Sequence, residues 1–110
     1  MITSITVTGD WLAPDGGTPG EGTVQFALSG EMTDSETFET VPKRTLQIDI
    51  AAGVIAVPIL ANNDPTTLPT NTFYNITENI VGATVLSYPA VIPYNAADGT
   101  IDLAQLRPAP

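Results

Sequence analysis

Apolar and polar residues alternate with a period of two along most of this chain. Ile5 and Val7 alternate with threonines, and Val24, Phe26 and Leu28 alternate with polar or smaller residues. This period predicts strands that turn one face toward a core. We expect strands at about residues 2–8, 23–28, 37–41, 45–50, 54–60, 73–80 and 84–94, followed by a short strand or helical turn within 100–110.

The spacing of these segments indicates the fold class. Turn-forming residues recur at intervals of about ten, the chain has ten prolines and nine glycines, and no segment has a convincing helical period. We therefore predict an all-β protein: a single antiparallel β-sandwich domain over 1–110, immunoglobulin-like or transthyretin-like. The tail, 100–110, is expected to pack on the domain or on a partner. An oligonucleotide-binding barrel is a weaker alternative, because this chain has no basic, aromatic-rich face.

Residues 54–60 (VIAVPIL) break the alternation, because no side chain on either face of this strand is polar. The three residues before it, ending in Gly53, suit a hairpin with a left-handed residue at that glycine, so we predict that 45–50 and 54–60 are antiparallel neighbours. Pro58 cannot donate to a strand ladder and predicts an edge position.

An edge strand that is apolar on both faces is normally covered, and the expected cover is another protein. Which face turns toward the core stays open at this point. The candidate partner interface comprises Val54, Ile55, Val57, Ile59, Trp11, Leu68 and Leu106.

Charge and composition narrow the function. Three basic and twelve acidic residues give a formal net charge of −9, which repels phosphate backbones and anionic lipids, so neither nucleic acid nor a membrane is an expected partner. No window approaches eighteen consecutive apolar residues, and the N-terminus does not read as a secretory signal. The chain has no cysteine and no histidine, which removes disulfides, thiolate ligands and the commonest metal ligand. We expect no cofactor and no metal.

Catalytic patterns are weak. Without histidine or cysteine, only Lys43 could activate a nucleophile, and it stands beside Arg44 like an ordinary pair of surface cations. We predict that the protein is not an enzyme. Trp11 could stack on a sugar, but closing the end of a sandwich is the commoner use of such an aromatic. Period two turns Glu78 inward, where it needs a hydrogen-bond partner unless the strand has already reached the rim.

Several segments resemble a family of small virion proteins of tailed bacteriophages, especially phages of actinobacteria. They are ITVTGDWLAPDG (5–16), GTVQFALSG (22–30), NNDPTTLPTNTFYNITENI (62–80) and VIPYNAADGTIDLAQLRP (91–108). The resemblance implies a structural, minor tail-type protein of the virion, made in the host cytoplasm. Its implied partners are other phage structural proteins and further copies of itself. Family members that continue into a fibre carry a further extension, so the resemblance does not imply host recognition here.

A second resemblance is to the B-type repeat of bacterial surface adhesins, whose late strand carries a pattern like Tyr74-x-x-x-Glu78. This resemblance implies a β-sandwich of the adhesin B-repeat type. In those domains the glutamate can assist an isopeptide bond from a lysine on an early strand. Lys43 is the only lysine available and is not in the first strand, so we predict no such crosslink.

Three functional hypotheses follow. A minor tail component of a phage is the first, and decoration of the capsid is the alternative within the same class. A carbohydrate-binding module, using Trp11 and the loop 61–71, is the alternative from another class.

Overall fold

The computed structural model describes residues 2–12 and 17–107. Residues 13–16, within the segment 5–16, and the end of the tail at 108–110 lie outside the described residues. The elements are β1 (Ser4–Asp10), β2 (Gly22–Leu28), β3 (Met32–Asp34), β4 (Thr40–Val41), β5 (Thr45–Asp49), β6 (Val54–Leu60), β7 (Thr67–Leu68), β8 (Tyr74–Ile80), β9 (Leu86–Ala90), the 3-10 helix η1 (Ala97–Gly99), β10 (Thr100–Asp102) and α1 (Leu103–Leu106). The prediction of an all-β, sandwich-like fold is confirmed.

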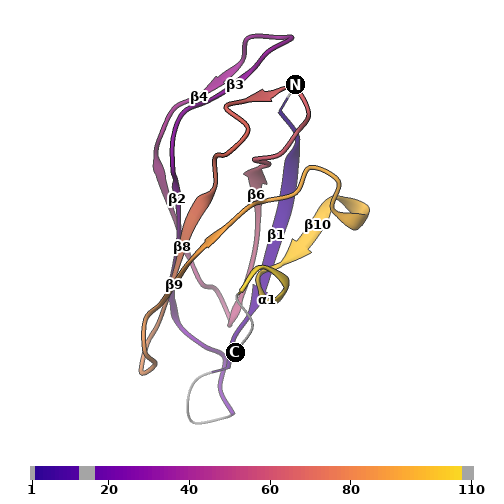
Figure 1. The fold of residues 1–110 in the computed structure, drawn as a ribbon. Coiled ribbons are helices and arrows are strands. Elements are labelled where there is room, and N and C mark those ends of the chain that lie inside the picture. Colours follow the sequence, from indigo (N-terminus) through magenta and orange to yellow (C-terminus); the bar gives the residue numbers. More distant parts are fainter. Residues whose placement is uncertain (1, 13–16, 108–110) are drawn as a thin grey trace.

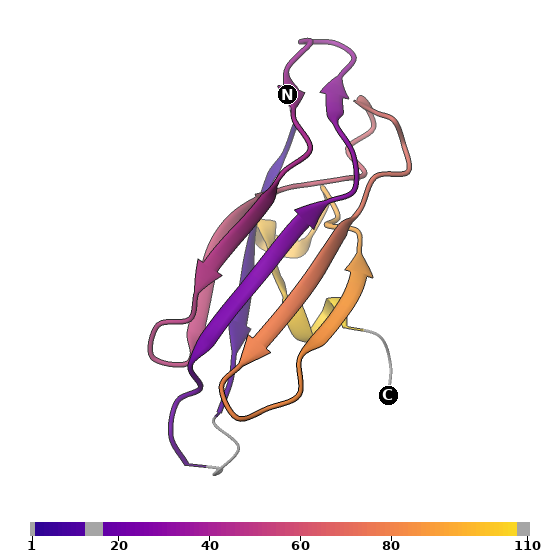
Figure 2. The same cartoon turned by 90° about the vertical axis from the view of Figure 1, so that its left-hand side faces the viewer.

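Two main sheets stack face to face. One has the order β10-β1-β6 and the other the order β5-β2-β8-β9, and a small sheet, β4-β3-β7, extends one end of the molecule (Figure 1). The second sheet is seen face-on in Figure 2, where β2 and β8 run through its middle. All strand pairs are antiparallel except β1 with β10, which is parallel. The molecule is elongated, with extents of 49 × 25 × 25 Å.

The core lies between the two main sheets and follows the predicted alternation. Val7 of β1 and Val24, Phe26 and Ile76 of β2 and β8 are almost fully buried. Phe26 also meets Tyr74 edge to face, with 6.3 Å between ring centroids. Burying each such side chain stabilises the fold by about 1.5–3 kcal/mol, so the two inward faces hold the layers together.

Two predicted strands are shorter than expected. The strand expected at 37–41 is reduced to Thr40–Val41, because the residues before it form a turn that the Asp34 carboxylate closes. Its Oδ1 accepts the backbone N–H of Glu36 at 2.8 Å and of Thr37 at 3.2 Å, and Phe38 has a φ of 61°. The strand expected at 84–94 is confined to Leu86–Ala90.

The predicted pairing of 45–50 with 54–60 is wrong. Ala52 and Gly53 both have positive φ, 52° and 81°, so the left-handed turn at Gly53 is present. However, β5 pairs with β2 and β6 pairs with β1, so the turn carries the chain from one sheet to the other. The physical reason is that each of these strands has an inward apolar row that the opposite sheet covers. The predicted edge position of Pro58 is confirmed, because β6 ends its sheet.

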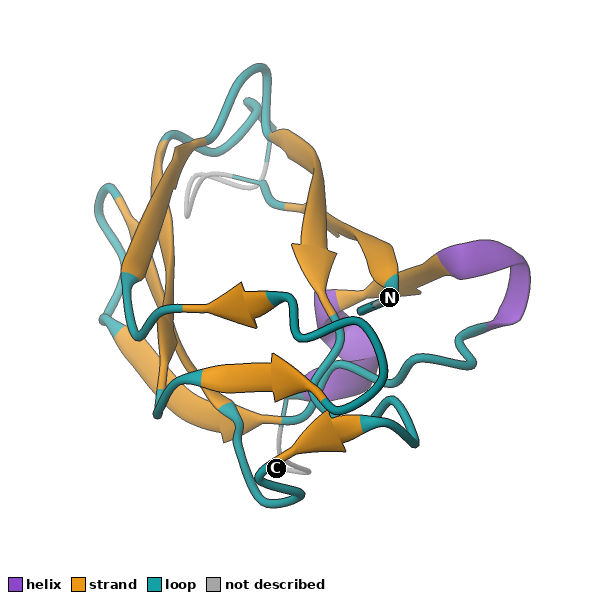
Figure 3. Cartoon of the chain, turned by 90° about the horizontal axis from the view of Figure 1, so that it is seen from above, coloured by secondary structure: helices purple, strands orange, loops and turns teal. Residues whose placement is uncertain are grey.

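The tail segment Thr100–Arg107 lies on the domain. β10 adds to the edge of β1, and Asp102 caps α1 by accepting the N–H of Ala104 at 2.9 Å. Leu103 is fully buried and joins the main core. The two helical elements, η1 and α1, lie on the same side of the molecule (Figure 3).

Candidate functional site

The structure decides which face of β6 meets the core. Ile55 and Ile59 are only 5% and 3% exposed and belong to the core, and Val57 between them is half-buried. The interface prediction is therefore wrong for Ile55 and Ile59, because the facing sheet of the same chain already covers them.

The other face of β6 points away from the core and is called here the β6 outer face. It consists of Val54, Ala56 and Pro58, which are exposed. Leu60, the last residue of the strand, is half-buried and packs against the core. Val54 is 47% exposed. The neighbouring strand β1 turns only serine, threonine and aspartate to this side. The β6 outer face is thus an apolar strip at a sheet edge, bordered by polar residues.

The remaining predicted interface residues do not form one surface. Trp11 lies beside the start of β6, because its backbone N–H donates to the Gly53 carbonyl at 2.8 Å. Leu68 is 51% exposed but belongs to β7, in the small sheet at the other end of the molecule. Leu106 is half-buried against the core from α1. Of the predicted set, only Val54 is on the β6 outer face, because the indole of Trp11 lies against Gly9 and donates to Glu78.

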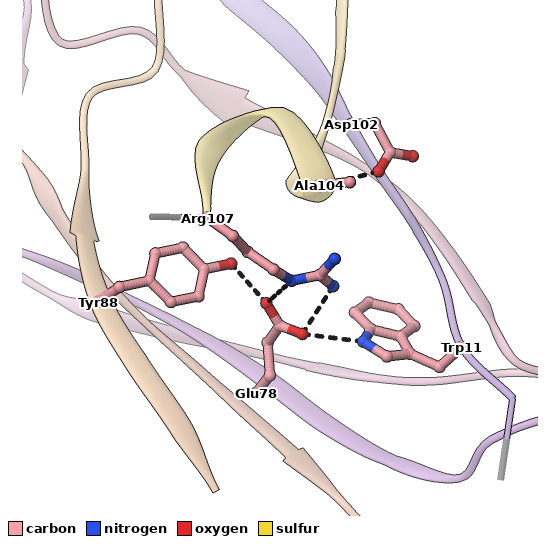
Figure 4. A network of polar contacts seen from close by, with 6 residues as sticks. All are labelled: Trp11, Glu78, Tyr88, Asp102, Ala104 and Arg107. Carbon is pink, nitrogen blue, oxygen red and sulfur yellow. Dashed lines mark hydrogen bonds and ion pairs between the residues drawn. The ribbon is translucent and has the colours of Figure 1, made fainter. Parts of the chain in front are cut away.

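A second candidate site is the buried carboxylate of Glu78, on β8, which is 4% exposed. Its Oε2 accepts from the Tyr88 hydroxyl at 2.5 Å and from the Arg107 Nε at 2.7 Å. Its Oε1 accepts from the Trp11 Nε1 at 2.9 Å and from the Arg107 Nη2 at 2.7 Å (Figure 4). This Glu78 cluster (Trp11, Glu78, Tyr88 and Arg107) joins β8, β9, the end of β1 and the C-terminal segment.

Electrostatics keep the Glu78 carboxylate ionised. Burial acts to raise the pKa of Glu78, but the hydrogen bonds from Arg107, Tyr88 and Trp11 outweigh it and hold the pKa below its ordinary value of 4.5. The hydrogen bonds that Arg107 donates to Glu78 raise the pKa of Arg107, while burial and then the bond to Glu78 raise the pKa of Tyr88. Both oxygens of this ionised carboxylate are engaged by donors of the protein, so neither is free to accept a proton from a substrate. The Glu78 cluster therefore suits a structural role.

Trp11 is covered rather than free to stack on a ligand. Its indole N–H is taken by Glu78, and the Arg107 guanidinium carbon lies 5.9 Å from the ring centroid. The backbone of Gly9 lies so close beneath the ring that a methyl group there would come within 2.3 Å of the indole. This agrees with the prediction that Trp11 closes an end of the sandwich.

Polar residues in the loop 61–71 are used within the chain. The buried side chain of Asn62 accepts the Ile92 N–H at 2.9 Å, and Asn63 accepts the Tyr94 N–H at 2.7 Å. The Asp64 carboxylate accepts from the Thr3 hydroxyl at 2.6 Å. These bonds attach the loop to the neighbouring segments. They leave fewer polar side-chain groups free to bind a sugar.

Other candidate chemistry is sparse in the part of the chain that the structure describes. Within residues 2–12 and 17–107, no three acidic side chains gather as a metal site would require. Among the same residues, no helix is long and apolar enough to cross a membrane. An isopeptide crosslink would need Lys43 beside Glu78. Lys43 is exposed and precedes β5, near the Ala27–Thr45 pair, whereas Glu78 lies further along β2, opposite Val24. The cation beside Glu78 is Arg107.

Comparisons with protein families, with curated proteins and with solved structures found no match to this chain.

Sequence reasoning found part of the Glu78 cluster. Period two correctly turned Glu78 inward and required a partner, and the alternative that the strand had reached the rim is wrong. Arg107 and Tyr88 were missed. A buried carboxylate in a chain with only three cations was a signal that one cation would be used to pair it.

Proposed function

We propose that this protein is a non-enzymatic structural subunit of a bacteriophage virion and belongs to the tail. The observation that carries the proposal is the β6 outer face, where Val54, Ala56 and Pro58 leave an apolar strip uncovered at a sheet edge. Such strips are commonly sites of contact with another chain. The resemblance of four segments to phage virion proteins supplies the class of assembly in which the cover would be found.

The chemistry of the Glu78 cluster supports a structural rather than a catalytic role. The carboxylate is ionised and accepts four hydrogen bonds, so its acceptors are occupied. Its bonds to Arg107 hold the C-terminal segment on the domain. A carboxylate that holds the C-terminal segment in this way stabilises the fold and does not transfer protons.

The two alternatives are separated by different observations. Capsid decoration would use the same β6 outer face and differs from a tail role only in location on the particle. A carbohydrate-binding module would need Trp11 as a platform, and its ring is covered by Gly9 and Arg107. That cover favours the virion subunit over the sugar-binding module.

The proposal is tested in a phage that encodes this chain. Purified tails and purified heads are each analysed by quantitative mass spectrometry, and we expect the protein in the tails. Detection only in heads would establish capsid decoration instead, and absence from both would refute the virion proposal.

The role of the β6 outer face is tested with the paired substitution Val54→Asp and Ala56→Asp. Both side chains are exposed, so the variant should fold, but charge on the strip should exclude it from particles. Ser4→Asp is the matched control, because it adds charge at an exposed, polar position of the adjacent strand. Incorporation of the paired variant at the wild-type copy number would show that the interface lies elsewhere.

A further inference from the structure

The long edges of the two main sheets differ in how they can accept another strand. In an antiparallel ladder, alternate residues bond to the neighbour, and the residues between them point their N–H and C=O to the free side. Bonds from Trp11 N–H to the Gly53 carbonyl and from Ala61 N–H to the Thr3 carbonyl show that the odd-numbered residues of β6 bond to β1. Pro58 therefore faces the free side, where it has no N–H to offer.

The same reasoning applies to β9, at the far edge of the other sheet. Bonds from Ser29 N–H to the Phe73 carbonyl and from Val81 N–H to the Glu21 carbonyl assign the odd-numbered residues of β8 to β2. Its even-numbered residues then bond to β9, and Pro89 faces the free side. Both long edges are thus interrupted by a proline, a common protection against strand addition.

β5 has no such protection. Leu28 N–H donates to the Arg44 carbonyl at 2.9 Å and Ile50 N–H donates to the Gly22 carbonyl at 3.0 Å, so the even-numbered residues of β5 bond to β2. The backbone groups of Thr45, Gln47 and Asp49 consequently point to the free side, and no described residue pairs with them. These three residues are called here the β5 open edge.

The inward side of β5 is also incompletely covered. Leu46 and Ile48 pack against the core but remain half-buried, as does Val57 on the facing strand β6. The two strands lie on the same side of the sandwich, joined by the turn at Gly53 (Figure 2). A strand added to the β5 open edge would gain backbone hydrogen bonds and cover this apolar seam at once.

Charge along β5 favours a particular occupant. Lys43 precedes the strand and Asp49 ends it, so its two ends have opposite charge. When two copies of β5 pair antiparallel about Gln47, Thr45 faces Asp49 of the other copy, and Lys43 is diagonal to that same aspartate. Opposite charges so placed attract, whereas parallel pairing would bring like charges together.

We propose that two copies of this chain pair through antiparallel β5 strands, about a two-fold axis at Gln47, and join their four-stranded sheets into one continuous sheet. The dimer does not depend on the phage assignment or on the β6 outer face. Backbone hydrogen bonds are exchanged between the Gln47 residues of the two copies, and between Thr45 of each copy and Asp49 of the other. Leu46 of each copy lies opposite Ile48 of the other. The interface is self-complementary, as two-fold symmetry requires.

Sedimentation equilibrium of the full chain should give a mass of twice 11.5 kDa, and amide exchange should be slow at Gln47 in the dimer. Gln47→Pro removes the N–H at the axis and leaves the backbone bonds between β5 and β2 intact. It also removes the exposed side-chain bond from Gln25 to Gln47, which contributes little to stability. The thermal transition should therefore persist while dimer affinity falls on the order of 100-fold. Ala56→Pro is the matched control, because it removes a free-side N–H from β6, and it should leave the dimer intact. Dissociation by Ala56→Pro but not by Gln47→Pro would overturn the proposal, and so would a chain that stays monomeric at its highest soluble concentration.

A charge exchange tests the antiparallel register separately. Lys43→Glu or Asp49→Lys alone should each weaken the dimer about 5- to 10-fold, because like charges then meet across the axis. The double variant restores opposite charges and should recover most of the affinity. If it does not, the two-fold β5 pairing is wrong, even for a protein that dimerises. Val54→Asp should leave the dimer unchanged, so failure of the dimer and failure of the virion proposal are distinguishable.

Discussion

The Arg107 guanidinium donates two hydrogen bonds of 2.7 Å to the carboxylate of Glu78, which lies 29 positions earlier in the chain. The pair attaches the C-terminal segment across the end of the sandwich. Because Glu78 is 4% exposed, the carboxylate depends on this guanidinium for compensation of its buried charge.

Arg107→Ala should be strongly destabilising. It leaves an ionised carboxylate buried with only the Tyr88 and Trp11 donors, and breaking such a pair typically costs about 3–5 kcal/mol. Denaturant unfolding monitored by circular dichroism measures the loss. Arg44→Ala removes an exposed arginine and is the control, with an expected change within about 0.5 kcal/mol. Equal losses of unfolding free energy for the two substitutions would show that the Glu78–Arg107 pair stabilises the fold no more than an exposed cation does.

The free energy of unfolding should depend on pH through the ionisation of Glu78. Its folded-state pKa lies below the ordinary value of 4.5, so the folded protein binds this proton less readily than the unfolded chain. The stabilisation is present in full above about pH 4.5 and is lost as the pH falls through the folded-state pKa. Glu78→Gln should therefore be less stable than the wild type at pH 7, with a gap that narrows below pH 4.5. Unfolding free energies measured across this range check the sign, and a gap that widens in acid would contradict it.

Gly9→Ala should displace the indole of Trp11. The added methyl group would come within 2.3 Å of the ring, and overpacking of this kind costs about 1–3 kcal/mol. Trp11 is the only tryptophan, so its fluorescence should shift to the red as the ring becomes more exposed. Gly30→Ala is the control, because a methyl group there meets nothing within 4 Å. An unchanged emission maximum for Gly9→Ala would mean that the ring is packed differently.

Substitutions along β6 should alternate in effect. Ile55→Asp places a carboxylate in the core and should abolish folding, since the penalty is comparable to the whole stability of a small domain. Val54→Asp, one position earlier, places the same group on the β6 outer face and should leave a cooperative thermal transition. Calorimetry of both variants measures the contrast. Unfolding by both would show that the outer face is also required for the monomer.

The alternation of apolar residues was enough to predict most of the strands and the inward direction of Glu78. It could not predict the partner of each strand, because the period-two pattern describes a face and carries no information on neighbours. The pairing of β5 with β6 failed for this reason. On β6 the candidate interface is wrong for Ile55, which is buried, and stays a prediction for Val54, which is exposed.

Local backbone preference and side-chain size were enough to predict the fold class, the edge position of Pro58, the turn at Gly53 and the closing role of Trp11. The covered face of β6, the cation that compensates Glu78 and the open edge become known only from the folded chain. These depend on contacts between residues far apart in the chain. Arg107 reaches Glu78 because the C-terminal segment crosses the end of the sandwich, and β5 keeps free backbone groups because it ends its sheet.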